Sequence, residues 1–224
     1  MAPSPGAAAL RNVSAGYGST AALRDVTAEL PRAGITAVVG RNGSGKSTLL
    51  AVLAGTHAPS GGAVDRPDAR RPALVPQRSA VSAALPLTVL DAVTMGRWAR
   101  RGWWRRLTRH DRAVVRDCME RTGVADLARR QLAQLSGGQH QRVLIAQGLA
   151  QEADLLLLDE PAAGLDDAGR ERILLILDQA KAQGVTVVHA THDPEAARHA
   201  DHCLLLEEGR LLAQGRYEDI RPAG

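Results

Sequence analysis

The chain has 224 residues and a hydrophobic content of 45%, which excludes a disordered chain and suits one large α/β domain with a buried core. The net charge is +4, but Lys46 and Lys181 are the only lysines, and alanine is abundant while phenylalanine is absent. We interpret the positive charge as a compositional bias toward arginine and not as a nucleic-acid signature. In such a sequence, a lysine at position 46 indicates a need for a compact ammonium group.

Neither the cysteines nor the N-terminus indicates secretion. Cys118 and Cys203 are far apart and have no CxxC partner, so we expect no disulfide framework, no cysteine-based zinc site and a reducing compartment. The N-terminal residues lack the pattern of a signal peptide, and no apolar stretch is long enough to span a bilayer. If the protein works at a membrane, we expect a partner to hold it there.

In chain order, the first elements are β-strands around a glycine-rich turn. Residues 9–30 alternate apolar and polar positions around Gly16-Tyr-Gly18, which predicts an antiparallel hairpin. The pattern then predicts, in order, a buried strand at 35–39, a helix at 46–54, a loop or edge region at 58–72 and a short strand at 73–76.

The second half predicts helices followed by parallel strands. Residues 88–150 are helical in pattern, with one helix opening at Thr88 and Asp91 and another at 111–122. Continuous apolar strands at 155–159 and 185–190 flank a helix at 167–183, and a terminal hairpin follows at 203–206 and 210–212. The expected fold class is α/β: a P-loop nucleotide-binding core with an antiparallel β subdomain and an inserted helical subdomain.

A phosphate-binding loop is predicted between the strand at 35–39 and the helix at 46–54. Gly40-Arg-Asn-Gly-Ser-Gly-Lys-Ser47 matches G-x-x-x-x-G-K-[ST]. Backbone N–H groups of such a loop surround the β-phosphate, and the helix dipole adds a favourable field. Lys46 is expected to bridge the β- and γ-phosphates of ATP, and Ser47 to bind Mg²⁺. The expected nucleotide contacts are Gly40, Asn42, Gly43, Ser44, Gly45, Lys46, Ser47 and Thr48.

A second motif, which is acidic, complements the phosphate-binding loop. Four leucines run into Asp159 and Glu160, which places both carboxylates at the C-terminal end of a strand, where open α/β sheets bind ligands. Asp159 is expected to hold the water shell of Mg²⁺, and Glu160 to act as the general base on the attacking water.

Leu135-Ser-Gly-Gly-Gln139 makes the chain resemble the ATPases of the ABC transporter family over nearly its whole length. Ser136 can cap a helix whose first N–H groups, at Gly137 and Gly138, form a second anion site. In that family, the signature of one subunit closes on the γ-phosphate held by the P-loop of another. The resemblance therefore implies a head-to-tail homodimer in which Ser136, Gly137, Gly138 and Gln139 contact the partner's ATP.

Other family positions occur in order. Tyr17 resembles the aromatic residue that stacks on adenine, Gln77 the Q-loop glutamine that touches Mg²⁺, and His192 the switch histidine near the γ-phosphate. Residues 163–166 resemble the D-loop and add Asp166 to the expected nucleotide contacts. The resemblance thus implies catalytic roles for Lys46, Gln77, Glu160 and His192, and Mg²⁺ contacts for Ser47, Gln77 and Asp159. Gly164, His140 and Pro194 depart from the common pattern without removing a catalytic group.

The run from Leu85 to Arg97, followed by Gly102-Trp-Trp-Arg-Arg106, resembles the manganese- and zinc-type branch of metal-ion importers. This implies uptake of a divalent metal ion, an integral membrane permease, a metal-binding solute-binding protein and a peripheral position on the cytoplasmic face. Iron-chelate importers share part of the pattern and remain an alternative. The expected cassette spans 8–220, with a core at 8–80 and 151–220 and a helical subdomain at 81–150.

Two features leave the interpretation open. The segment 97–109 holds all three tryptophans among many arginines, and we consider a solvated basic face, contact with anionic lipid headgroups, or nucleic-acid binding. The histidines His189, His192, His199 and His202 do not have the spacing of a closed zinc site. A nucleic-acid-handling ABC ATPase and an exporter subunit are the rival classes. ATPases of chromosome maintenance insert long coiled coils where this chain has a short helical lobe, and those acting on ribosomes carry two tandem cassettes where this chain has one. Exporter subunits usually have a fused membrane domain or a different lobe.

Overall fold

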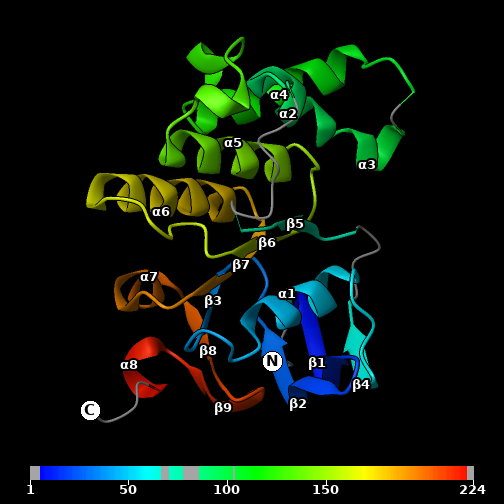
Figure 1. The fold of residues 1–224 in the computed structure, drawn as a ribbon, viewed down its shortest axis with the longest axis vertical. Coiled ribbons are helices and arrows are strands. Elements are labelled where there is room, and N and C mark those ends of the chain that lie inside the picture. Colours follow the sequence, from blue (N-terminus) through cyan, green and yellow to red (C-terminus); the bar gives the residue numbers. More distant parts are fainter. Residues whose placement is uncertain (1–5, 67–70, 78–85, 103, 221–224) are drawn as a thin grey trace.

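Two β-sheets and a lobe of helices make up the protein (Figure 1). The computed structural model describes residues 6–66, 71–77, 86–102 and 104–220. The strands are β1 (Ala8–Tyr17), β2 (Thr20–Leu30), β3 (Ile35–Val39), β4 (Gly61–Asp65), β5 (Ala73–Val75), β6 (Leu155–Asp159), β7 (Thr186–Thr191), β8 (His202–Glu207) and β9 (Arg210–Gly215). The α-helices are α1 (Lys46–Ala54), α2 (Val89–Met95), α3 (Trp98–Arg101), α4 (Arg109–Arg121), α5 (Gly137–Leu149), α6 (Asp167–Ala182), α7 (Pro194–His199) and α8 (Tyr217–Ile220). Short 3₁₀ helices lie at Ala125–Leu127 and Leu132–Gln134.

The N-terminal strands form a three-stranded antiparallel sheet in the order β2-β1-β4. Tyr17 pairs with Thr20 at the tip of the β1–β2 hairpin, which confirms the hairpin predicted for 9–30. The alternation of apolar and polar residues in β2 places every apolar side chain from Val26 to Leu30 on the buried face. The stretch predicted as a loop or edge contains β4, which is the edge strand of this sheet.

The larger sheet has six strands in the order β5-β6-β7-β3-β8-β9. All neighbouring pairs are parallel except β8 and β9, which form the terminal antiparallel hairpin. All six residues of β7 are buried, as are the four leucines of β6, because both faces of the sheet are covered. The continuous apolar runs in the sequence therefore correctly predicted the central strands.

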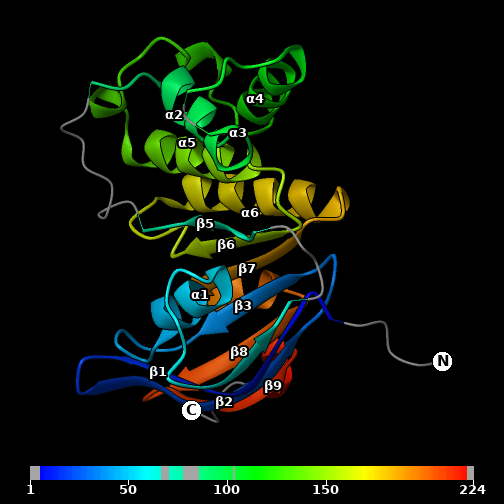
Figure 2. The ribbon, with the colours of Figure 1, turned by 90° about the vertical axis from the view of Figure 1, so that its right-hand side faces the viewer.

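Two hydrophobic cores lie on the two faces of the larger sheet. On one face, α1 is enclosed between the two sheets, and Leu49, Leu50 and Leu53 are fully buried there. On the other face, α5 and α6 lie between the sheet and helices α2, α3 and α4 of the lobe (Figure 2), and this core includes Ile145, Ile173 and Leu177. Helices α2 to α5 follow β5 and precede β6 in sequence, so this helical lobe is an insertion into the sheet.

Capping residues set the helix boundaries of the lobe. Thr88 caps α2 and Thr108 caps α4, each in a capping box with the Asp three residues later. The start predicted at residue 111 was therefore slightly late, because Thr108 and Asp111 together begin the helix.

The short helix α7 was not predicted. Asp193 caps it, and Pro194 occupies its first turn, where a backbone N–H would have no partner within the helix.

Both cysteines are free and buried, Cys118 in α4 and Cys203 in β8. Among the described residues, no helix has the length and apolar content needed to cross a membrane.

Candidate nucleotide site

The loop between β3 and α1 has the backbone that a phosphate cradle requires. Gly43 and Gly45 adopt positive φ angles of 82° and 102°, which only glycine adopts readily. A Cβ atom on Gly45 would also lie 2.5 Å from the carbonyl oxygen of Ala22, so close packing excludes any side chain there. The loop leads directly into the N-terminus of α1, whose first N–H groups have no partner within the helix.

Lys46 is buried, with 6% of its side chain exposed. Its Nζ donates hydrogen bonds to the carbonyl oxygens of Gly40 at 2.8 Å and Arg41 at 3.1 Å. The ammonium is thus held across the mouth of its own loop by two carbonyls, a position from which it can turn to bound phosphate oxygens.

Residues from three neighbouring parallel strands meet beside Lys46. Glu160 follows β6 and His192 follows β7, while the loop itself follows β3. The Glu160 Oε1 atom lies 3.8 Å from Lys46 Nζ and 3.2 Å from His192 Nδ1. The carboxylate therefore stands between a cation and an imidazole at the carboxyl end of the sheet, where the sequence predicted a general base.

The backbone of Glu160 is strained. Its φ angle is 48°, an uncommon value for a residue with a side chain, and Pro161 follows it. The Glu160 N–H donates to the carbonyl oxygen of Ala190 at 3.1 Å, so β7 holds this turn in place. Such strain persists where the surrounding structure fixes it, and it is concentrated at functional sites.

Asp159 and Ser47 fit a divalent cation. The Asp159 Oδ1 atom is buried and has no hydrogen-bond partner among the described residues. Burial raises the pKa of Asp159 above its usual range, and the Ser47 side chain opposes that rise. In the described part of the chain, no cluster of three or more His, Cys, Asp or Glu side chains could enclose a metal. An ion here would therefore complete its shell with water and phosphate oxygens, as Mg²⁺ commonly does.

Tyr17 offers a flat surface at the tip of the β1–β2 hairpin, with 58% of the residue exposed. The His57 ring packs beside it, with centroids 4.5 Å apart and planes inclined by 34°. His57 Nε2 lies 3.1 Å from the Gly16 carbonyl oxygen, which ties this ring to the hairpin. Sequence analysis missed His57, because a single histidine after a helix carries no recognisable signal.

The signature segment lies at the start of α5, in the helical lobe. Ser136 is the N-cap: its hydroxyl accepts from the Gln139 N–H at 3.3 Å, while Gln139 Oε1 accepts from the Ser136 N–H at 3.0 Å. The predicted cap is confirmed, and Gln139 is a member of it. Gly137 and Gly138 form the first turn. No described hydrogen bond or ion pair joins this segment to the P-loop of the same chain.

No hydrogen bond or ion pair in the described part of the chain joins Gln77 or Asp166 to Lys46 or Glu160. Gln77 is exposed just beyond the end of β5, and the segment that follows it, 78–85, lies outside the described residues. The Asp166 side chain caps α6 by accepting from the Gly169 N–H at 2.9 Å. Gly164 has a φ angle of 69°, so the glycine that departs from the family pattern permits a left-handed turn.

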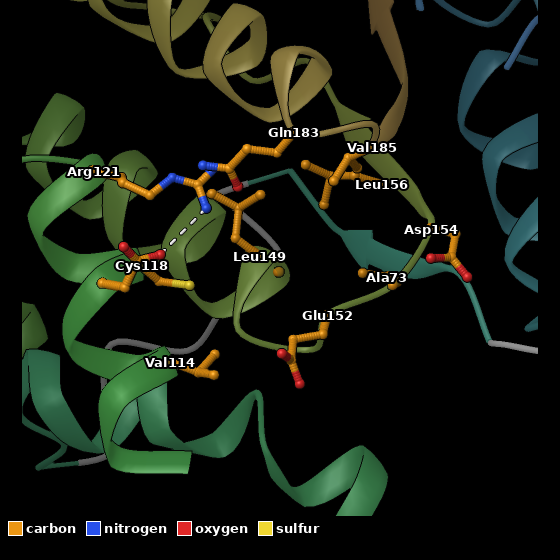
Figure 3. A pocket seen from close by; sticks show the side chains of 13 residues that line it. Ala73, Val114, Cys118, Arg121, Leu149, Glu152, Asp154, Leu156, Gln183 and Val185 are labelled. Carbon is orange, nitrogen blue, oxygen red and sulfur yellow. Dashed lines mark hydrogen bonds and ion pairs between the residues drawn. The ribbon is translucent and has the colours of Figure 1, made fainter. Parts of the chain in front are cut away.

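A separate cavity of about 270 Å³ lies near the N-terminal ends of β5, β6 and β7, where Ala73, Leu156 and Val185 line it (Figure 3). Val114, Cys118 and Arg121 of α4 face Leu149 and Leu156 across it. Arg121 forms an ion pair with Asp117 at 3.5 Å. Because its lining includes the carboxylates Asp117, Glu152 and Asp154, this cavity is unsuited to a nucleotide, and we assign the nucleotide to the P-loop.

These features define a nucleotide-hydrolysing cassette. It has a P-loop at the N-terminus of α1, an acidic pair after β6 and a capped signature helix in an inserted lobe. The family model described as ABC transporter matches residues 23–163, and the chain belongs to that family as an ABC-type ATPase. It is 40% identical to the zinc transport system ATP-binding protein TroB of Treponema pallidum, over 89% of this chain and 77% of TroB. It is 36% identical to the manganese transport system ATP-binding protein MntB of Bacillus subtilis, over 94% of this chain and 87% of MntB. The hemin import ATP-binding protein HmuV of Thermobifida fusca is 40% identical, over 92% and 75% of the two chains.

Solved structures show the same fold. An ABC transporter of metal-chelate type in an inward-facing conformation matches with a TM-score of 0.87 and 33% identity, over 97% of this chain and 85% of the other. The dimeric bacterial ABC transporter cassette MJ0796 matches with a TM-score of 0.80 and 27% identity, over 94% and 98% of the two chains. These matches confirm the predicted ABC ATPase fold.

Proposed function

We propose that this ABC ATPase powers uptake of a divalent metal ion, zinc or manganese, as a head-to-tail homodimer beneath an integral membrane permease. The observation that carries the catalytic part is the contact of Glu160 with both Lys46 and His192 at the carboxyl ends of β6, β3 and β7. The whole segment 8–220 is then one cassette, in which 81–150 is the helical subdomain and the remainder is the nucleotide-binding core.

Each group at the site has a defined task in this proposal. Lys46 exchanges its two carbonyl partners for phosphate oxygens and neutralises their charge. Glu160 takes the proton of the attacking water, and His192 holds the Glu160 carboxylate toward that water. Asp159 and Ser47 would hold Mg²⁺, with Gln77 as a further predicted contact, and the ion would stabilise the negative charge of the phosphates. Tyr17 stacks on adenine, and His57 supports the Tyr17 ring from one side.

Replacing Lys46 tests the catalytic proposal directly. We expect Lys46→Ala to abolish ATP hydrolysis while circular dichroism shows a folded protein, because the ammonium faces two carbonyls and not the apolar core. Lys46→Arg should also fail, since a planar guanidinium does not fit between the carbonyls of Gly40 and Arg41. The second lysine supplies the control: Lys181 is paired with Asp201 on the surface, and Lys181→Ala should keep wild-type turnover. Wild-type ATPase activity in Lys46→Ala would overturn the assignment.

The names of the relatives support the choice of metal. TroB and MntB are zinc and manganese transport proteins by name, whereas HmuV is a hemin import protein, so an iron-chelate importer is the competing function. We expect deletion of the gene to impair growth under chelation of zinc or manganese. Zinc or manganese should restore growth and iron should not. Restoration by iron or hemin alone would move the chain to the iron-chelate branch and leave its ATPase role intact.

The proposed partners follow from that function. A permease in the membrane would hold the chain at the cytoplasmic face, and a metal-binding solute-binding protein outside would supply the ion. Purification of the complex from membranes tests this arrangement: the cassette should remain bound to one permease after detergent extraction. Recovery of the cassette with ribosomes or nucleic acid instead would favour the rival class.

A further inference from the structure

The turn between α3 and α4 is the most basic and aromatic surface of the helical lobe. Residues 97–112 hold seven arginines and all three tryptophans of the chain, with Asp111 as their only acidic residue. Helix α3 lies at one side of the lobe and faces the viewer in Figure 2. Trp98 is 42% exposed and Trp104 is 73% exposed; Trp103 lies outside the described residues. The catalytic proposal gives none of these side chains a task.

A buried ion cluster closes the base of this turn. Arg97 and Asp111 are 2% and 1% exposed, and Arg97 Nη2 lies 3.0 Å from Asp111 Oδ1. Arg97 also donates to the carbonyl oxygen of Ala150 at 2.6 Å and to Glu152 at 2.9 Å. The two ends of the turn are thus joined to each other and to the segment before β6, so its tip is presented outward from a fixed base.

The cations at the tip have no acidic partners. Arg105, Arg106 and Arg109 are exposed, and none of them forms an ion pair with any residue that the structure describes. The ion pairs at the base use other side chains, namely Arg97, Arg100 and His110. Unpaired arginines next to exposed indole rings suit a surface that is both anionic and partly apolar.

We propose that the described side chains of this turn, Trp98, Trp104, Arg105, Arg106 and Arg109, bind the anionic lipid surface of the membrane. Arginines near an anionic bilayer are attracted by its negative surface potential, and tryptophan rings favour the depth of the headgroups. The exposed tryptophans distinguish this surface from a merely solvated basic face. A single-stranded nucleic acid also offers phosphates and rings for stacking, and it is an outcome of the test below. The inference goes beyond the proposed function, and its failure would leave the ATPase assignment intact.

Tryptophan fluorescence reports on this turn alone, because every tryptophan of the chain lies at position 98, 103 or 104. The full chain is titrated with vesicles of phosphatidylcholine alone and of an equimolar mixture of phosphatidylcholine and phosphatidylglycerol. We expect binding and a blue shift of the emission only with the anionic vesicles. Added salt should weaken this binding, since the attraction is screened within a Debye length.

Paired arginine variants distinguish binding by this turn from a general effect of the protein's net charge. Arg105→Gln/Arg106→Gln should lower vesicle affinity about thirtyfold, because each arginine near an anionic surface contributes about 1 kcal/mol. The matched control is Arg129→Gln/Arg130→Gln, which removes the same charge from two consecutive exposed arginines elsewhere in the lobe. The control should bind like the wild type, and both variants should keep wild-type ATP hydrolysis. Trp104→Ala should bind more weakly and show a smaller blue shift.

Three outcomes would overturn the proposal. One is the absence of any difference between neutral and anionic vesicles. Another is an equal loss of affinity in the control variant, which would assign the binding to overall charge. The third is a fluorescence change with a single-stranded oligonucleotide, sensitive to Arg105→Gln/Arg106→Gln, without binding to vesicles; this would assign the turn to nucleic acid.

Discussion

Glu160 shows how a single residue is positioned by both its backbone and its side chain. The strained φ angle of 48° and the hydrogen bond to Ala190 fix where the side chain leaves the turn. Lys46 and His192 then fix the carboxylate. A base held in this way needs little reorganisation when substrate arrives, and such preorganisation is a large part of catalysis in phosphoryl transfer.

His189 gives a testable case of a buried titratable residue next to this site. It lies in β7 and is 1% exposed, and its Nε2 atom has no hydrogen-bond partner among the residues that the structure describes. Burial lowers the pKa of His189 to about 4, with a smaller contribution from His199. The unfolded chain therefore binds a proton between pH 6.5 and 4 that the folded protein does not, so stability falls as the pH falls through this window.

We therefore predict that His189→Leu makes the protein less sensitive to acid. As the pH falls from 6.5 to about 4, His189 should lower the unfolding free energy of the wild type by about 3 kcal/mol. The variant should lack this decrease. At neutral pH the variant should be at least as stable, because an unpaired buried nitrogen is replaced by an apolar group. Urea denaturation of both proteins at several pH values measures the difference. Parallel pH dependences in the two proteins would show that His189 is not buried in its neutral form.

At the residue scale, the sequence predicted positions that belong to ordered motifs and missed those that do not. Lys46, Asp159 and Glu160 were recognisable because their motifs follow a strand, and this location is set by chain geometry alone. His57 was missed because it reaches Tyr17 through the fold and not through sequence spacing. Arg97 appeared only as one arginine of a basic run, and nothing in that pattern marked it as buried.

At the scale of secondary-structure elements, buried charged side chains such as Arg97 join neighbouring elements to one another. Helices α3 and α4 meet the segment before β6 through the cluster of Arg97, Asp111 and Glu152. Glu152 also binds Arg100 and His110, and its φ angle is 51°. Helix periodicity predicted these helices but not how they attach, because attachment depends on hydrogen bonds between residues 53 and 55 positions apart.

We predict that Arg97→Leu lowers the unfolding free energy by about 3–5 kcal/mol, since the buried Asp111 carboxylate loses the Arg97 guanidinium. The double variant Arg97→Leu/Asp111→Asn should recover much of this loss, because Asn removes the buried charge and its amide oxygen can still accept from the Thr108 N–H in the capping box. Arg100→Leu, in which a side chain that is 43% exposed is replaced, should cost less than about 1 kcal/mol. Urea titrations give all three values. A double variant less stable than Arg97→Leu would mean that the two side chains do not act as a pair.

At the scale of the whole molecule, the two predicted anion sites belong to different parts of the fold. The P-loop belongs to the sheet core, whereas Ser136 begins α5 in the helical lobe. Each segment offers unpaired helix N-terminal N–H groups, which attract anions. Their location in separate parts of the fold is compatible with the prediction that a partner chain supplies the second anion site. The family resemblance implied this dimer, and the structure of one chain leaves it a prediction.

The sharpest prediction at this scale concerns a dimer that is trapped by slow hydrolysis. Removing a general base slows the chemical step by a factor on the order of 10²–10⁴, or about 3–5 kcal/mol, while binding is spared. Glu160→Gln should therefore bind ATP with Mg²⁺ without turning it over, and keep it between the P-loop of one chain and Ser136, Gly138 and Gln139 of the other. Size-exclusion chromatography with light scattering should find a dimer with ATP and Mg²⁺ and a monomer without them.

A charge at the signature should break that dimer without affecting the P-loop. In the Glu160→Gln background, Gly137→Asp places a carboxylate at the first position of α5, where an acid suits the helix dipole but repels the partner's γ-phosphate. Nucleotide titration should find monomer affinity unchanged, while light scattering finds no dimer. Ala182→Asp, which adds the same charge at the exposed end of α6, should still dimerise. If the Glu160→Gln/Gly137→Asp protein dimerises with ATP, the signature is not part of the composite site, and each chain must complete its hydrolytic site by other means.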